Sequence, residues 1–294
     1  MRNRYRDAIV AGATAGVLGV VWLGVTHVAG QVQRANQPQT PYRAPRTADG
    51  RPDLNGIWQA LVPANWDIQG HAAGPSPFPE LLGAIGAVPA GQGVVEGHDI
   101  PYQPWALAKK RENLEKRLAP ESFADVYNRI GGDPEARCYL PGVPRATYMP
   151  FPFQIVQTPK YILIAHEYAV ASRTILMDST AKSPVESWMG WSIGRWQGDT
   201  LVVDVTDFNE NTWFDRAGNF HSEALHVVER YTPMTPYHLQ YEATIEDPKV
   251  FTRPWKISLP LYRRMEPNVQ LMEFKCVEFA EPLMYKTLRK PGSK

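Results

Sequence analysis

The sequence predicts a mainly β protein: an antiparallel β-barrel with a short helical insertion. From residue 150 onward, short runs rich in β-branched and aromatic residues follow one another. Turn signals separate these runs about every 10–15 residues, a spacing typical of barrels and sandwiches. The chain also has 27 prolines and 22 glycines, which favour turns and short strands over a helical bundle.

The predicted strands are the segments in which apolar or aromatic residues recur between turn signals. Gln197-Gly-Asp199 separates two such segments and predicts a tight hairpin. In chain order, we expect strands at Phe153–Gln157, Tyr161–His166, Arg173–Met177, Ser192–Trp196, Thr200–Thr206, Glu223–Tyr231, His238–Glu246, Trp255–Tyr262 and Val269–Phe279.

The helical insertion is expected within residues 60–135. Pro104–Leu118 carries Leu107, Leu114 and Leu118 near one face, which predicts a helix, and Pro120–Ile130 continues as a second short one. Residues 60–100 are rich in Gly, Ala and Pro and predict a long irregular segment. We expect the helix and this segment to cover the mouth of the barrel.

The N-terminus predicts export. Arg2, Arg4 and Arg6 precede an uncharged run over Ala8–Thr26, and small residues end the segment at Gly30. Residues 1–30 are therefore expected to be a cleaved signal peptide. The alternative is an uncleaved anchor, because the run approaches the roughly 20 residues that span a bilayer. An extended linker is expected over 31–55, a single barrel domain over 56–285 and a tail over 286–294.

The two cysteines, Cys138 and Cys276, both lie in the exported part of the chain. An even number of cysteines in an oxidising compartment predicts a disulfide bond. Two free buried thiols are the alternative. Export and the disulfide together predict a periplasmic protein, with the membrane contacted only through the N-terminal segment if that segment is not cleaved.

The barrel domain opens with Asp53-Leu-Asn-Gly-Ile-Trp58. Gly-x-Trp at the start of an antiparallel barrel resembles the opening of the lipocalins, a calycin family. There the glycine permits a sharp bend and the tryptophan closes one end of the barrel. This resemblance implies a fold and no chemistry. A core tryptophan is the alternative interpretation of Trp58.

Longer segments resemble a family of exported proteins from Gram-negative bacteria. They are Ser192–Asp204, His221–Tyr231 and Tyr241–Pro248, together with Thr252-Arg-Pro-Trp255. The resemblance covers most of residues 52–280 and implies export and a β-rich domain. The family brings no reaction, so no catalytic residue is carried over from it.

Acid–base chemistry is suggested by the densest polar cluster. On an extended chain His221 and Glu223 point to the same face, so they could act as base and acid. Asp204 would orient one of them, and His166 is the substitute for either. With His166 or His226, the pair could instead bind a metal ion; our prediction assigns no metal and no cofactor. Alternatively, these histidines are core residues and Glu223 accepts hydrogen bonds in a turn.

Aromatic residues and arginines suggest a binding cavity. Aromatic walls suit a small hydrophobic or aromatic molecule, and an arginine can clamp a carboxylate. Core packing and ordinary ion pairs are the alternatives. The candidate ligand-binding residues are Trp188, Trp191, Trp196, Trp213, Trp255, Tyr148, Phe153, Arg145 and Arg195, with Phe151 and Phe214 beside them.

Several functions are excluded. A formal net charge of +1 with no dominant basic face argues against nucleic-acid binding. The sequence also contains no Gly-x-Ser-x-Gly elbow, phosphate-binding loop or dinucleotide fingerprint. We therefore expect an exported barrel that binds a small hydrophobic or amphipathic molecule. The alternatives are a lyase, hydratase or isomerase on the same barrel, and an envelope protein that binds another protein.

Overall fold

The computed structural model describes residues 42–77, 82–84, 86–117, 132–277, 288 and 290–292. The signal peptide predicted at 1–30, the first part of the predicted linker, the second short helix predicted at Pro120–Ile130 and most of the predicted tail lie outside the described residues.

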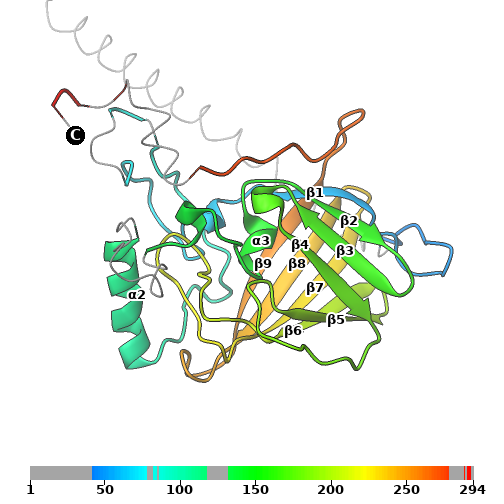
Figure 1. Ribbon diagram of the computed structural model, residues 1–294. Coiled ribbons are helices and arrows are strands. Elements are labelled where there is room, and N and C mark those ends of the chain that lie inside the picture. Colours follow the sequence, from blue (N-terminus) through cyan, green and yellow to red (C-terminus); the bar gives the residue numbers. More distant parts are fainter. Residues whose placement is uncertain are drawn as a thin grey trace, which may run out of the picture. The chain divides into compact units, whose positions relative to one another are not determined.

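Nine strands form one closed barrel in chain order, and β9 returns to pair with β1 (Figure 1). This confirms the prediction of a mainly β barrel. The strands are β1 Gly56–Ala60, β2 Phe153–Gln157, β3 Tyr161–His166, β4 Ser172–Met177, β5 Trp191–Gln197, β6 Thr200–Thr206, β7 His226–Thr235, β8 His238–Glu246 and β9 Trp255–Arg263.

One pair of neighbouring strands departs from the expected antiparallel pattern. β4 and β5 are parallel, with Ile175 opposite Ser192, whereas the other neighbours are antiparallel. The connection over residues 178–190 is long enough to return the chain to the end of the sheet where β4 began, which a parallel pair requires. The hairpin between β5 and β6 is as predicted, with Gly198 at a φ of +60°.

Alternation along most strands fills the interior of the barrel with side chains. On β8, Leu239, Tyr241, Ala243 and Ile245 are buried, and the residues between them are half-buried on the outer face. This two-residue period places every second side chain in the core because successive side chains of a strand point to opposite faces.

The segment predicted as a linker is partly packed onto the barrel. Leu54 is fully buried; its N–H donates to Oε1 of Gln157 at 3.1 Å, and its carbonyl accepts from Nε1 of Trp58 at 2.9 Å. A bridge between Arg46 and Pro52 closes a turn just before it. Leu54, near the end of the segment predicted as a linker, therefore completes the core beside β1.

The irregular insertion continues the barrel wall where β1 ends. After β1 ends at Ala60, residues 94–96 of the insertion take its place beside β9. The N–H of Ser258 donates to the carbonyl of Val94, and the N–H of Glu96 donates to the carbonyl of Lys256, both at 2.9 Å. Val94 and Val95 are buried. The insertion thus contributes to the side of the barrel.

The described residues also form five helices: η1 Pro63–Asn65, α2 Pro104–Lys116, η2 Glu135–Arg137, α3 Arg145–Tyr148 and η3 Tyr168–Val170. Helix α2, as predicted, begins with a proline, whose fixed φ suits the first helical position. Its contact face differs from the expected leucine face. Ala106 and Asn113 are buried, whereas Leu107 and Leu114 are exposed.

Two strand predictions are corrected. Residues 269–277 form no strand, because β1 and β9 already close the barrel and leave no sheet edge to join. Strand β7 begins at His226 and not at Glu223. The N–H of Ser222 donates to Asp247 at 2.7 Å and the N–H of Ala224 donates to Oγ of Ser222 at 3.1 Å, so side chains hold this stretch in a turn.

The predicted disulfide between Cys138 and Cys276 is formed, with their Cα atoms 5.6 Å apart. A structural disulfide indicates an oxidising compartment. Within the ranges that the structure describes, no helix combines the length and the apolar character needed to cross a bilayer.

Candidate ligand-binding groove

Three adjoining hollows lie on the outside of the barrel, at the end where β1 finishes and β2 begins. The first has a volume of about 400 Å³, the middle one about 430 Å³ and the third about 550 Å³. Asn65, Trp66 and Pro150 line both the first and the middle hollow, and Gln59 and Leu61 line both the middle and the third. We call these three adjoining hollows together the groove.

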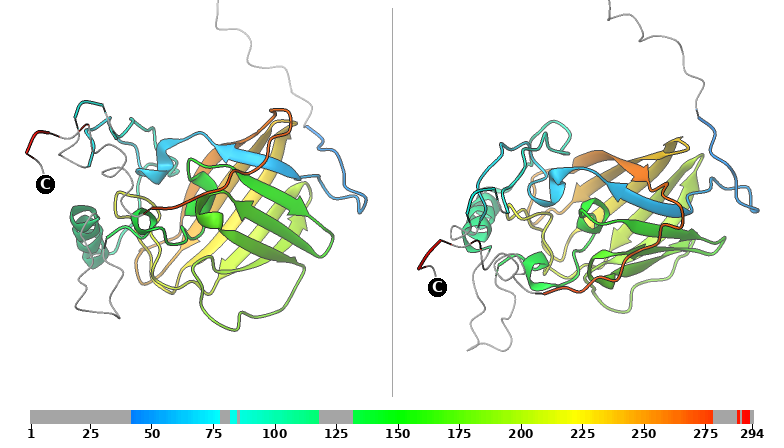
Figure 2. Two further views of the ribbon diagram at one scale, coloured as in Figure 1. Left: turned by 45° about the horizontal axis from the view of Figure 1, so that its top comes forward. Right: turned by 90° about the horizontal axis from the view of Figure 1, so that it is seen from above.

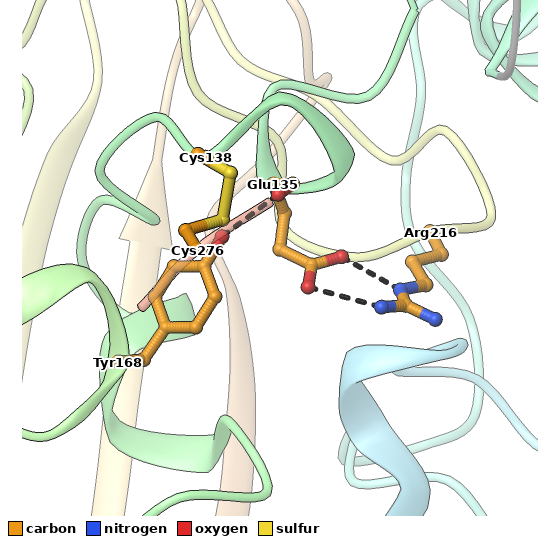
Figure 3. The surroundings of a disulfide bond; sticks show 5 residues. All are labelled: Glu135, Cys138, Tyr168, Arg216 and Cys276. Carbon is orange, nitrogen blue, oxygen red and sulfur yellow. Dashed lines mark hydrogen bonds and ion pairs between the residues drawn. A yellow bond between two sulfur atoms is a disulfide. The ribbon is translucent and has the colours of Figure 1, made fainter. Parts of the chain in front are cut away.

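An ion pair lies at the floor of the first hollow. Both carboxylate oxygens of Glu135 accept hydrogen bonds from Arg216, at 2.7 and 3.0 Å (Figure 3). The hydroxyl of Tyr168 donates to the backbone carbonyl of Glu135 at 2.7 Å. Burial alone would raise the pKa of Glu135, but the charge and hydrogen bonds of Arg216 lower it below its usual range. The floor is thus a fixed pair of opposite charges.

A fully buried arginine, Arg145, supports a residue of this hollow. Arg145 is 1% exposed, donates twice to Asp133 at 2.8 and 2.9 Å, and donates through Nε to Asn65 at 2.7 Å. Burial opposes the charged form of Arg145, but the bidentate Asp133 raises its pKa above the ordinary value. Asn65 lines the groove, so Arg145 fixes the position of a groove residue without reaching the groove itself.

Aromatic side chains form the walls of the first hollow. The guanidinium of Arg216 lies 4.3 Å from the centre of the Trp66 ring, a cation–π contact. Across the hollow, the ring of Phe274 lies 5.2 Å from that of Phe151 and 5.0 Å from that of Tyr168. An apolar ring could contact either wall while a polar group faces the ion pair.

The wall that carries Phe274 belongs to a segment without regular structure, residues 264–277, which we call the arm. In Figures 1 and 2 the arm (orange to red) leaves the end of β9 and runs back past β1. The N–H of Arg264 donates to the carbonyl of Ile57 at 2.8 Å, and the N–H of Met272 donates to Glu167 at 2.8 Å. The disulfide at Cys276 then joins the arm to Cys138, three residues after Glu135 in the floor.

The four predicted catalytic residues do not converge. His221 is buried and Glu223 is exposed in an ion pair with Lys249. Asp204 lies on the outer face of β6, 3.0 Å from Nε2 of His226, whose Nδ1 is 3.4 Å from Glu246. The same-face geometry expected for residues 221 and 223 is wrong because this stretch is a turn and not a strand.

His221 has partners for both ring nitrogens. Its Nδ1 donates to the carbonyl of Ser222 at 2.8 Å, which leaves Nε2 to accept from the hydroxyl of Thr212 at 2.6 Å. Burial lowers the pKa of His221 and keeps the ring neutral. The rings of Phe208 and Phe214 contact it. These contacts match the alternative interpretation of a core histidine.

His166 faces the barrel interior from the end of β3 and is 5% exposed. Burial, together with the charge of Arg173, lowers its pKa to about 3. Among the described residues, none forms a hydrogen bond with its Nε2. His166 is therefore a neutral interior ring that packs against Phe153, with ring centres 5.4 Å apart.

None of the nine predicted ligand-binding residues lines the groove. Tyr148, Phe153 and Trp255 are buried in packing contacts, and Arg145 is held by Asp133. The remaining five are Trp196, which packs against the core; Trp188, Trp191 and Trp213, which are half-buried; and Arg195, which is exposed. Of the neighbouring aromatics, Phe151 lines the groove.

Sequence reasoning also missed a charged cluster inside the barrel. Arg173 of β4 donates to Glu229 of β7 at 2.6 Å, and both side chains are buried. The hydroxyls of Tyr231 and Tyr241 donate to Glu229 at 3.0 and 2.8 Å. These residues come from three strands and all point into the barrel. The alternation within each strand indicates that they face inward, but composition alone does not.

Asp215 anchors the loop next to the groove. It is fully buried and accepts from the N–H groups of Ile68, Ala217 and Asn219 and from the Asn219 amide, at 2.6–3.2 Å. Burial and the nearby Asp67 raise the pKa of Asp215 to about 7. The backbone N–H of Arg216 donates to the carbonyl of Asn65 at 2.9 Å, which joins this loop to the groove wall.

No cluster of three or more His, Cys, Asp or Glu side chains is placed to hold a metal ion within the described part of the chain.

Comparison of the chain with protein-family models, with curated proteins and with solved structures finds no match. The resemblance to exported Gram-negative proteins therefore stays a prediction.

Proposed function

We propose that this is an exported, periplasmic protein that binds a small hydrophobic or amphipathic molecule in the groove. The observation that carries the proposal is the first hollow, where Trp66 and Phe274 flank the Glu135–Arg216 pair. Ligand sites are commonly concave and mostly apolar with a few fixed polar groups, and this hollow has that composition.

The groove replaces the barrel interior as the binding site. The interior-facing side chains of the strands are buried against one another, and the three hollows all lie outside the barrel. A ligand in the groove would contact a rigid barrel edge on one side and the arm on the other.

The alternative of an acid–base enzyme has less support. His221 and His166 are buried in packing contacts, Glu223 is exposed and paired with Lys249, and no predicted catalytic residue lines the groove. The alternative of an envelope interaction protein has one supporting feature, the exposed Trp105 and Leu107 on α2.

Binding of 1-anilinonaphthalene-8-sulfonate, an apolar fluorescent anion, tests the proposal. We expect saturable binding that Trp66→Ala weakens about tenfold or more, because an aromatic wall is lost. Trp191→Ala is the matched control, since Trp191 is also half-buried but lies outside the groove. Equal weakening by both variants, or by neither, would contradict the proposal.

A further inference from the structure

We infer that the ligand is an elongated anionic amphiphile: an unbranched hydrocarbon chain with a carboxylate head. The inference rests on the proposed function and adds the shape and charge of the ligand. The head would lie in the first hollow beside Lys275, and the chain would run through the middle hollow toward the third.

The elongated shape of the ligand is inferred from the way the three hollows adjoin. The middle hollow shares Trp66 and Pro150 with the first hollow and Leu61 with the third, so the three hollows adjoin in a row, an arrangement that suits an elongated molecule. A compact ligand would fill a single hollow and leave the other two open. A chain would contact all three.

The apolar character follows from the middle hollow and the rim. No charged residue lines the middle hollow among the described residues; apart from Gln59 and Asn65, its lining is Ala, Leu, Val, Pro and Trp. Large apolar side chains at the edge of the groove are exposed: Leu61 at 66%, Met265 at 60% and Val277 at 53%. Exposed apolar groups gathered at one groove mark a binding surface, and a hydrocarbon chain would remove them from water.

The negative charge of the ligand is inferred from the residues at the two ends of the groove. The first hollow is lined by Arg216, Lys275 and Glu135, and the third by Arg263, Arg264 and Glu266, so cations outnumber anions at both. Three of these four cations are held in place. Arg216 is hydrogen-bonded to Glu135, and Arg263 packs over the ring of Trp58. Arg264 is hydrogen-bonded to Gln59 and Glu266.

Lys275 is the cation best able to exchange its partner. It pairs only with Glu273 at 2.7 Å among the described ion pairs, and both side chains are more than three-quarters exposed. Exposed pairs of this kind contribute little free energy, so a ligand carboxylate can compete for the ammonium group. The head group is therefore assigned to Lys275.

Calorimetric titration with saturated carboxylates of about eight, ten and twelve carbons tests the inference. We expect affinity to rise about two- to fourfold for each added methylene, since burial of a methylene contributes about 0.8 kcal/mol when complete. Alkyltrimethylammonium ions of equal chain length test the charge, and we expect them to bind at least about tenfold more weakly.

Substitutions at two exposed residues separate the binding of the hydrocarbon chain from that of the carboxylate head. Leu61→Asn should reduce the dependence on chain length, and Val185→Asn, at an equally exposed valine outside the groove, should not. Lys275→Gln should lower the affinity for carboxylates to that of the matching alcohols. Affinity independent of chain length, or equal affinity for anionic and cationic chains, would overturn the inference. Retained binding of the compact fluorescent anion would then show that the proposed function had survived.

Discussion

The guanidinium of Arg263, at the end of β9, lies 4.2 Å from the centre of the Trp58 ring on β1. Trp58 and Arg263 are also paired across the seam where the barrel closes. Arg263 donates to the carbonyls of Asn55 at 2.6 Å and Pro236 at 3.0 Å, so its position is fixed on both sides. Trp58 and Arg263 thus join β1 and β9 at the seam of the barrel.

This contact predicts the effect of a methyl group at Gly56. A Cβ there would lie 2.3 Å from a terminal nitrogen of Arg263, and the φ of +137° is one that L-residues rarely adopt. We expect Gly56→Ala to lower the free energy of unfolding in urea by at least about 2 kcal/mol. Gly198→Ala is the control, because its φ is also positive but a Cβ would meet open space. Equal losses in both would remove the role assigned to Arg263.

The Arg173–Glu229 pair predicts a large cost for a conservative change inside the barrel. Glu229→Gln would leave Arg173 buried without a compensating charge, which costs about 3–5 kcal/mol. Glu242→Gln, on the outer face of neighbouring β8, should change stability by less than about 0.5 kcal/mol. Chemical denaturation of both variants measures the difference. A small effect of Glu229→Gln would mean that water reaches this cluster.

Low pH should destabilise the protein through His166. Its pKa falls from about 6.5 in the unfolded chain to about 3 in the fold, so the unfolded state binds more protons between these values. The stabilisation is complete above pH 6.5 and decreases as the pH falls toward 3, by up to about 1.4 kcal/mol per pH unit.

His166→Gln should remove this dependence. Denaturation at several pH values between 7 and 4 should show a shallower loss of stability in the variant than in the wild type. Asp215 titrates in the same pH range, and because its pKa is raised, its effect on stability has the opposite sign. This effect is the same in the wild type and the variant. Parallel pH profiles would contradict the neutral state assigned to His166.

The disulfide should stabilise both the fold and the groove. Cys138 and Cys276 are 138 residues apart in sequence, and opening a loop of that length costs about 4–5 kcal/mol in the chain-entropy model. The Cys138→Ser/Cys276→Ser double variant should lose that stability. It should also bind the fluorescent anion more weakly, since Phe274 and Val277 line the first hollow beside Cys276. Phe274→Ala keeps the disulfide bond. It therefore separates the effect of losing the Phe274 ring from the effect of losing the disulfide.

The sequence predicted what is local. Strands β2, β3, β6 and β8 have the predicted bounds because alternation and turn residues are properties of short segments. The disulfide followed from a simple count of cysteines. The irregular structure of the arm was not predicted, since residues 269–277 have strand-like composition. They form no strand because β1 pairs with β9 and leaves no free sheet edge.

The groove depended on contacts that no short segment contains. Trp66 lies in the irregular insertion, Arg216 in a loop and Phe274 near the end of the described barrel domain, and the fold alone brings them together. The sequence instead favoured tryptophans in the most patterned region. Those residues, such as Trp196 and Trp255, pack in or against the core because patterned positions are the ones that a barrel buries.

Photo-crosslinking with a long-chain carboxylate that carries a diazirine on its chain tests the central claim most directly. Peptide mapping should place the label on residues of the groove, such as Leu61, Trp66 and Phe274. Excess unlabelled carboxylate should compete for these positions. Label on interior residues such as Trp196 or Leu201 would place the ligand inside the barrel and contradict the groove as the binding site.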